Sequence, residues 1–176
     1  MKKYIILFAL LLLGQAGFSQ SQAVENFHNK YKDNGKYISV RIDGGILNIL
    51  SCIETNDEEA QEMLEAMSKI DAINVHSIDR DEDEFSESDI TKFKKEIQKE
   101  KFDELMIVRD GDTDVDFLIK EKKGKISDLL LVVDEPDEFI IVSISGEIDL
   151  KTIAEITENL DIKGSKHMDQ LKEKQN

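Results

Sequence analysis

The sequence predicts a single α+β domain, in which an antiparallel four-stranded meander is extended by two further strands and the helices pack mainly on one face of the sheet. Two observations predict this class. Four apolar or alternating segments follow one another in the second half of the chain, and the connections between them are only a few residues long. Connections this short permit only antiparallel neighbours, and amphipathic helical patterns flank the strands.

The predicted meander lies in the second half of the chain. Its strands span residues 105–109, 115–121, 126–133 and 139–145. The three connections between them contain Gly111, Gly124 and Pro136, respectively. Glycine and proline at such positions are typical of the tight turns that join hairpin strands. We therefore expect each strand to pair with the one that precedes it.

The two further strands come from the first half of the chain. Residues 37–43 alternate, with Ile38, Val40 and Ile42 on one face and polar side chains on the other, which predicts a half-buried strand. A second alternating segment around Ile73 and Val75 predicts the sixth strand. We expect both strands to extend the meander into one sheet.

Apolar residues at helical spacing predict five helices. The second is almost wholly apolar and is expected to be short and heavily buried. Thr55 and Glu58 are spaced as a capping box, which is expected to begin the third helix. Ser86 and Asp89 can cap the fourth, and Asp149 the last. The apolar positions of these helices fall within residues 24–31, 46–53, 60–67, 90–97 and 150–160.

The first 19 residues are interpreted as a cleavable secretion signal. Lys2 and Lys3 precede an unbroken apolar run over residues 4–13, which is too short to cross a bilayer. Gly17 and Ser19 then supply the small side chains that signal peptidase requires. We expect residues 1–19 to be removed, 20–162 to form the domain, 163–176 to form a polar, disordered tail, and no integral membrane segment to remain.

The strongly acidic composition limits the classes of partner. The chain contains 23 basic and 38 acidic residues, which gives a formal net charge of −15. Removal of the leader takes away Lys2 and Lys3 but no acid, so the mature net charge would be −17. Phosphate binding needs a surplus of Lys and Arg, so nucleic acid is excluded as a partner, and anionic lipid surfaces are disfavoured in the same way.

Cys52 is the only cysteine, so the chain forms no internal disulfide. It lies in the apolar stretch 46–53 without a cationic neighbour in the local sequence. A reactive thiol needs such a neighbour, and free cysteines are among the most buried residues of proteins. We expect Cys52 to be a small buried side chain.

Several segments together resemble a known family. They are the leader, the early helix, the strand with its glycines (Ile38 to Gly45), the Met- and Leu-rich helix, and the segment from Ile141 to Leu150, which ends Gly-Glu-Ile-Asp-Leu. This combination is similar to domain-of-unknown-function family 4252, small exported proteins of Gram-negative bacteria. The resemblance implies an exported α/β protein with periplasmic location most favoured. It implies no catalytic residues.

One segment has the spacing of a calcium loop. Asp110, Asp112, Asp114 and Glu121 occupy the first, third, fifth and twelfth positions, where calcium loops place acidic oxygens. The sixth position is Val115 where glycine is required, and the sequence continues as a strand where a helix should follow. We favour a hairpin turn at Asp110 and retain calcium as the alternative.

The remaining candidates for site chemistry are weak. His28, His76 and His167 are far apart and lack partners at metal-ligand spacing. Ser143 and Ser145 alternate on a predicted strand and lack the sharp turn of a nucleophile elbow. We therefore expect no catalytic residue, no cofactor and no metal other than the calcium candidate.

Apolar strand surface is the remaining functional signal. The runs from Leu129 to Val133 and from Phe139 to Val142 are apolar at consecutive positions, so both faces of these strands should avoid water. Helices on both faces would satisfy this requirement. If helices cover only one face, the tail, a second copy or a protein partner would cover the other. The sequence thus favours a non-catalytic, exported binding or regulatory module. The alternatives are a hydrolase that uses acidic residues and a calcium-stabilised surface protein.

Overall fold

The computed structural model describes residues 21–148 of the 176-residue chain. The predicted signal peptide, the last predicted helix and the polar tail lie outside the described residues. The elements are α2 (Gln22–Tyr31), β1 (Tyr37–Asp43), α3 (Gly44–Ser51), α4 (Glu58–Ser68), β2 (Ile70–Asp79), α5 (Glu87–Lys99), β3 (Asp103–Asp110), β4 (Thr113–Lys122), β5 (Lys125–Asp134) and β6 (Glu138–Ile148).

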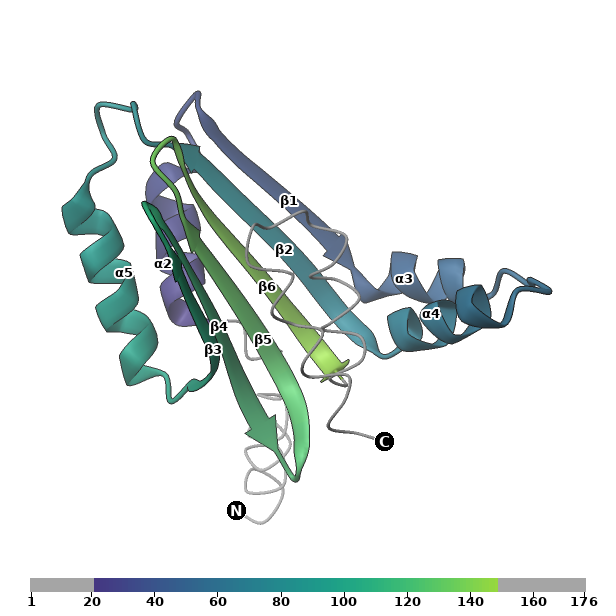
Figure 1. Ribbon diagram of the computed structural model, residues 1–176. Coiled ribbons are helices and arrows are strands. Elements are labelled where there is room, and N and C mark those ends of the chain that lie inside the picture. Colours follow the sequence, from purple (N-terminus) through teal and green to yellow (C-terminus); the bar gives the residue numbers. More distant parts are fainter. Residues whose placement is uncertain (1–20, 149–176) are drawn as a thin grey trace, which may run out of the picture.

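The strands form one sheet in the order β1-β2-β6-β5-β4-β3, and every neighbouring pair is antiparallel (Figure 1). The last four strands lie side by side in chain order because their connections are tight turns. Lys123, Gly111 and Gly124 adopt the positive φ angles that such turns require. The predicted α+β class is confirmed, and β1 and β2 extend the sheet beside β6.

One face of the sheet is covered by α2 and α5 (Figure 1). Phe27 of α2 and Phe93 of α5 contact Phe139 of β6, with ring centroids 5.7 Å and 5.9 Å from it. Aromatic rings in such tilted or edge-on arrangements stabilise a core beyond the area that they bury. The predicted cap at Ser86 and Asp89 is confirmed, in the form of a capping box that fixes the start of α5. These contacts position the two helices on the sheet.

The opposite face of the sheet carries a second apolar cluster. Phe117, Leu131 and Ile144 lie at its centre, and Leu47 of α3 packs into it. Side chains of β5 and β6 are therefore buried on both faces, as the consecutive apolar residues predicted. The runs 129–133 and 139–142 lie in these central strands and do not offer the exposed surface for a partner that the sequence suggested.

The helices α3 and α4 differ from their predicted forms. The apolar residues of α3 were expected to be buried, but Ile46 and Ile49 are exposed and Leu47 is the apolar side chain that reaches the core. The predicted cap of α4 was also wrong. Asp57, not Thr55, caps this helix, because its side chain accepts a hydrogen bond from the Ala60 N–H at 3.1 Å.

Within residues 21–148, the longest helix is far shorter and more polar than a membrane-spanning helix.

Candidate functional site

The calcium candidate is not assembled by the fold. Asp110, Asp112 and Asp114 lie at or beside the turn between β3 and β4, whereas Glu121 lies near the far end of β4. Asp114 and Glu121 are seven steps apart along the strand, a distance of about 23 Å at 3.3 Å per residue. Asp114 is instead paired with Arg109, whose Nε lies 3.2 Å from Asp114 Oδ1. The twelfth ligand of the predicted loop therefore cannot reach the others.

Metal-ligating side chains do not converge elsewhere in the described part of the chain, where no group of three or more His, Cys, Asp or Glu residues is placed to hold an ion. Cys52 was expected to be buried and is exposed. It follows the last turn of α3, where its backbone N–H still bonds to the carbonyl of Ile49. Its burial was predicted from the apolar stretch around it, but that stretch faces solvent.

A hydrogen-bonded cluster joins two histidines that the sequence analysis treated as unrelated. The Tyr37 hydroxyl lies 3.0 Å from His28 Nδ1 and 2.6 Å from His76 Nδ1. Because the hydroxyl carries one proton, one ring donates to the Tyr37 oxygen and the other accepts from it. Ser39 Oγ lies 3.2 Å from the same nitrogen of His76. The cluster thus ties α2 to β1 and β2.

The protonation states of this cluster are set by burial. Burial, with a smaller electrostatic contribution from His28, lowers the pKa of His76 to about 4. Burial also raises the pKa of Tyr37 to about 12. Both shifts favour the neutral form of the side chain. His76 is therefore a neutral, structural histidine at physiological pH.

We expect acid to destabilise the protein through His76. In the unfolded chain the His76 side chain has a pKa near 6.5, so it becomes protonated as the pH falls below that value. In the folded protein it stays neutral until the pH falls to about 4. Stability is therefore lost as pH falls through this window, by about 2 kcal/mol between pH 7 and pH 5. Urea unfolding of the wild type and of His76→Asn measures this loss, because the variant removes the titration and keeps every carboxylate. Parallel pH dependence in the two proteins would contradict the assignment.

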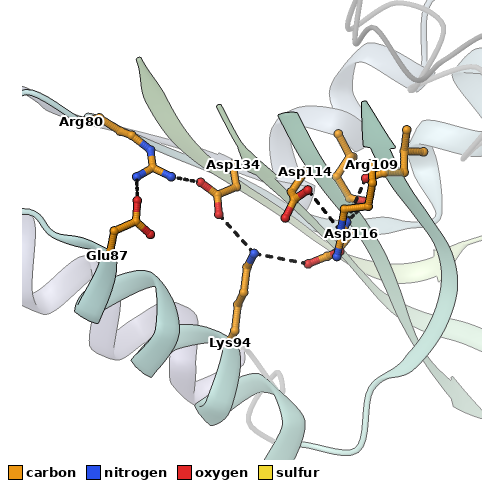
Figure 2. Close-up of polar contacts among 9 residues, drawn as sticks. Arg80, Glu87, Lys94, Arg109, Asp114, Asp116 and Asp134 are labelled. Carbon is orange, nitrogen blue, oxygen red and sulfur yellow. Dashed lines mark hydrogen bonds and ion pairs between the residues drawn. The ribbon is translucent and has the colours of Figure 1, made fainter. Parts of the chain in front are cut away.

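Charged side chains form a network between α5 and the ends of the strands (Figure 2). Arg80, just after β2, pairs with Asp134 at the end of β5 and with Glu87 of α5. Lys94 Nζ lies 3.2 Å from Asp134 Oδ2 and 3.9 Å from Asp116 Oδ2. Asp134 therefore accepts two cations, and so fastens α5 to the sheet.

Arg109 completes the network on the outer strand. Its Nη2 lies 2.6 Å from Asp116 Oδ1, and its Nε contacts Asp114. Asp114 lies directly opposite Asp134 in the pairing of β4 with β5, a juxtaposition of like charges that would be destabilising alone. The cations on both sides offset this repulsion. The network therefore accounts for carboxylates that would otherwise repel one another.

A pocket of about 200 Å³ lies beside this network, between α5, β3 and β4. Lys94, Arg109 and Asp116 line it together with apolar side chains such as Phe102 and Leu118. Its volume is below the roughly 300–1,000 Å³ of typical small-molecule sites. Both oxygens of Asp116 form ion pairs, Oδ2 with Lys94 and Oδ1 with Arg109. The arrangement stabilises the fold.

Removing Asp134 should loosen α5. We expect Asp134→Ala to lower the free energy of unfolding by about 2 kcal/mol, because it leaves Arg80 and Lys94 partly buried without their shared acceptor. Asp114→Ala is the matched control, since Asp114 is more exposed and should cost less than about 1 kcal/mol. Chemical denaturation of both variants measures the difference. Equal losses would show that the network contributes little through Asp134.

Exposed apolar side chains lie on β1, on α3 and the residues just after it, and on α4. We call this the β1–α3 surface. Ile49 is 71% exposed and Val40 is 46% exposed. The apolar residues of β1 and α3 were predicted to be buried, and these exposed positions correct that prediction. The β1–α3 surface consists of Ile38, Val40, Ile46, Ile49, Leu50, Ile53 and Met63.

The part of this surface that lies on β1 and α3 has no net formal charge. Residues 37–53 contain one basic and one acidic side chain, Arg41 and Asp43, in a chain whose net charge is −15. Arg41 Nη1 donates to Asn74 Oδ1 at 3.2 Å, and Asp43 accepts from the Gly45 N–H at the start of α3. Both charged groups thus already make contacts within the fold.

Comparison with known proteins is consistent with the family suggested by the sequence. No curated protein and no solved structure matches the chain. The family model described as "Domain of unknown function (DUF4252)" matches residues 31–156. The match begins at the last residue of α2 and includes all six strands. The chain belongs to the DUF4252 family of domains of unknown function.

Proposed function

We propose that this protein is an exported, non-catalytic module of the cell envelope that binds a protein partner through the β1–α3 surface. The observation that carries the proposal is the exposure of that surface. Single exposed apolar side chains are normal, but adjoining ones on one surface are typical of interaction sites. Here they occupy one strand, the helix that follows it and the neighbouring helix.

The character of the polar groups supports binding over catalysis. His76 and Tyr37 are held neutral within the fold by burial, which fixes their pKa values far from physiological pH. Asp116 and Asp134 each lie against two cations. These groups are engaged in stabilising contacts between helices and strands.

The charge of the chain defines the kind of partner. An acidic protein repels other acidic surfaces, and residues 37–53 of the β1–α3 surface add no net charge to this repulsion. A partner of apolar and neutral character fits it. Polycationic or nucleic-acid partners have no matching feature there.

Capture from envelope fractions with crosslinking tests the proposal. The tagged mature chain, Ile49→Lys and Ile107→Lys are used as baits. Ile107 is 44% exposed but lies on β3, at the opposite edge of the sheet, so it is a matched control for an exposed apolar residue. We expect Ile49→Lys to lose proteins that the wild type and Ile107→Lys both retain. The same capture by all three baits would refute the β1–α3 surface as the binding site.

Export is tested separately from binding. We expect mass spectrometry of the native protein to find an N-terminus at or near Gln20. Replacing Leu11 and Leu12 with Asp should leave the precursor in the cytoplasm, because each charge in the centre of an inserted apolar helix costs about 2.5–3.5 kcal/mol. Met1 retained on protein in the envelope fraction would contradict cleavage.

A further inference from the structure

We infer that the occupant of the β1–α3 surface is a second copy of this chain, which pairs edge to edge through β1 so that the two sheets become continuous across a two-fold axis. This inference rests on the proposed function, since it names the partner of the same surface. It is carried by three observations: the open edge at β1, the self-complementary sequence of that strand, and its neutrality within an acidic chain.

The outer side of β1 is an open edge. β1 pairs with β2 along all seven of its residues, from Tyr37 to Asp43, without a bulge. In the described residues no strand or helix lies along its other side (Figure 1). An edge strand of this kind presents unpaired N–H and C=O groups that can accept another strand. Its alternate side chains Ile38 and Val40 are exposed.

The opposite edge of the sheet is protected where β1 is not. β3 carries acidic side chains at Asp103, Glu104 and Asp110, and its pairing with β4 is interrupted by an irregularity between Glu104 and Met106. Charges and bulges on an edge strand oppose pairing with another chain. β1 has a regular ladder, no Pro and no Lys within its bounds. The two edges therefore differ in the features that control strand addition.

The sequence of β1 complements itself in an antiparallel register centred on Val40. In this register Ile38 lies opposite Ile42 of the second copy, and Val40 lies opposite its equivalent, so one face forms an uninterrupted row of apolar pairs. On the other face Arg41 lies opposite Ser39. Centring on Arg41 would place two like charges directly opposite, which is destabilising. The register that uses the whole strand is thus the one without charge conflict.

Electrostatics favour this face for two copies of the same chain. Two mature molecules, each with a net charge of −17, repel one another, and residues 37–53 have zero net formal charge. Approach through this surface keeps the acidic regions apart. Added salt screens the remaining repulsion, so association should strengthen with ionic strength.

Sedimentation velocity of the complete mature chain, residues 20–176, tests the dimer. At ~100 µM protein, a complex with a micromolar Kd is mostly assembled. We expect the wild type and Ile107→Lys to sediment as dimers and Val40→Lys to sediment as a monomer. Both substituted side chains are about equally exposed and lie on edge strands, so loss of folding is expected for neither and is checked by circular dichroism. A monomeric wild type, or a Val40→Lys dimer as stable as the wild type, would overturn the inference.

A disulfide trap gives a second measurement of the register. In a Cys52→Ser background, Val40→Cys places two thiols directly opposite across the axis, within reach of one another. We expect oxidation to link the copies covalently. Ile107→Cys in the same background should not be linked under these conditions. Absence of a Val40→Cys link would contradict the register centred on Val40.

Failure of the dimer and failure of the proposed function give different results. If the wild type is monomeric but Val40→Lys still loses a captured envelope protein, the dimer is overturned and the binding function stands. If the β1 amides that point away from β2 exchange slowly in the monomer, the edge is filled by the chain's own residues, and the dimer is again overturned. If neither capture nor association responds to Val40→Lys or Ile49→Lys, both proposals fail.

Discussion

Gly146→Ala is expected to destabilise the protein by about 3 kcal/mol or more, the cost of backbone strain combined with a collision that cannot be relieved by a side chain. Gly146 in β6 has φ +142°, a conformation that residues with a Cβ rarely adopt. A Cβ there would lie 2.4 Å from the carbonyl oxygen of Lys69 and 2.8 Å from the Cα of Ile70. Both are backbone atoms at the start of β2.

The same glycine maintains the contact between β6 and the segment that leads into β2. The N–H of Glu147 donates to the Lys69 carbonyl at 2.9 Å, so displacement of this carbonyl would break that hydrogen bond as well. Gly35→Ala is the control, because a Cβ at Gly35 would meet no atom within 4 Å. Urea unfolding should show a large loss for Gly146→Ala and a change within about 0.5 kcal/mol for Gly35→Ala. Similar values for both would contradict the close approach.

Phe139→Ala should lower the free energy of unfolding by about 3–5 kcal/mol, the range for truncation of a buried aromatic side chain. Phe139 has no exposed surface and contacts rings on two helices and the loop between β2 and α5. Its centroid lies 5.7 Å from Phe27 and 5.7 Å from Phe85. The side chain therefore holds several elements on one face of the sheet, and its loss leaves a cavity that they cannot all close.

Ile107→Ala is a suitable control for Phe139→Ala. It also truncates an apolar strand residue, but Ile107 is largely exposed and should cost less than about 1 kcal/mol. Calorimetric melting of both variants measures the difference. A small loss for Phe139→Ala would mean that α2 and α5 do not depend on β6 for their position.

The strands could be predicted from local sequence because their burial is regular. β4 alternates between the two faces, while β5 and β6 are apolar at consecutive positions because both of their faces are buried. Gly111 and Gly124 mark turns that leave no choice but antiparallel pairing. The position of β1 and β2 beside β6 could not be predicted in this way, since it depends on contacts between distant parts of the chain.

The helix α3 shows where the same reasoning fails. An apolar stretch predicts burial only when the fold supplies something to cover it. α3 lies at one end of the sheet, beyond the strands, and only one side of it reaches the core (Figure 1). Ile49 and Cys52 therefore face solvent, and the apolar sequence of α3 forms part of an exposed surface instead of a core.

The polar clusters were missed for a different reason. His28 and His76 are 48 positions apart, and Lys94 meets Asp134 only because α5 packs across the sheet. Sequence spacing carries no signal for such meetings. The ion pair of Arg109 and Asp114 could have been predicted from the sequence, because a tight turn at 110–113 places these residues opposite one another. The calcium spacing in the same segment was the misleading signal.

Hydrogen exchange of the mature chain at low and high protein concentration tests most directly whether the β1–α3 surface is an interaction site. We expect the amides of residues 37–53 to exchange more slowly at high concentration, while those of β3 keep the same rate. To detect a different partner, the same exchange rates are measured at low protein concentration after native envelope extract is added. Exchange at residues 37–53 that is unchanged under both conditions would contradict the β1–α3 surface as the site of binding.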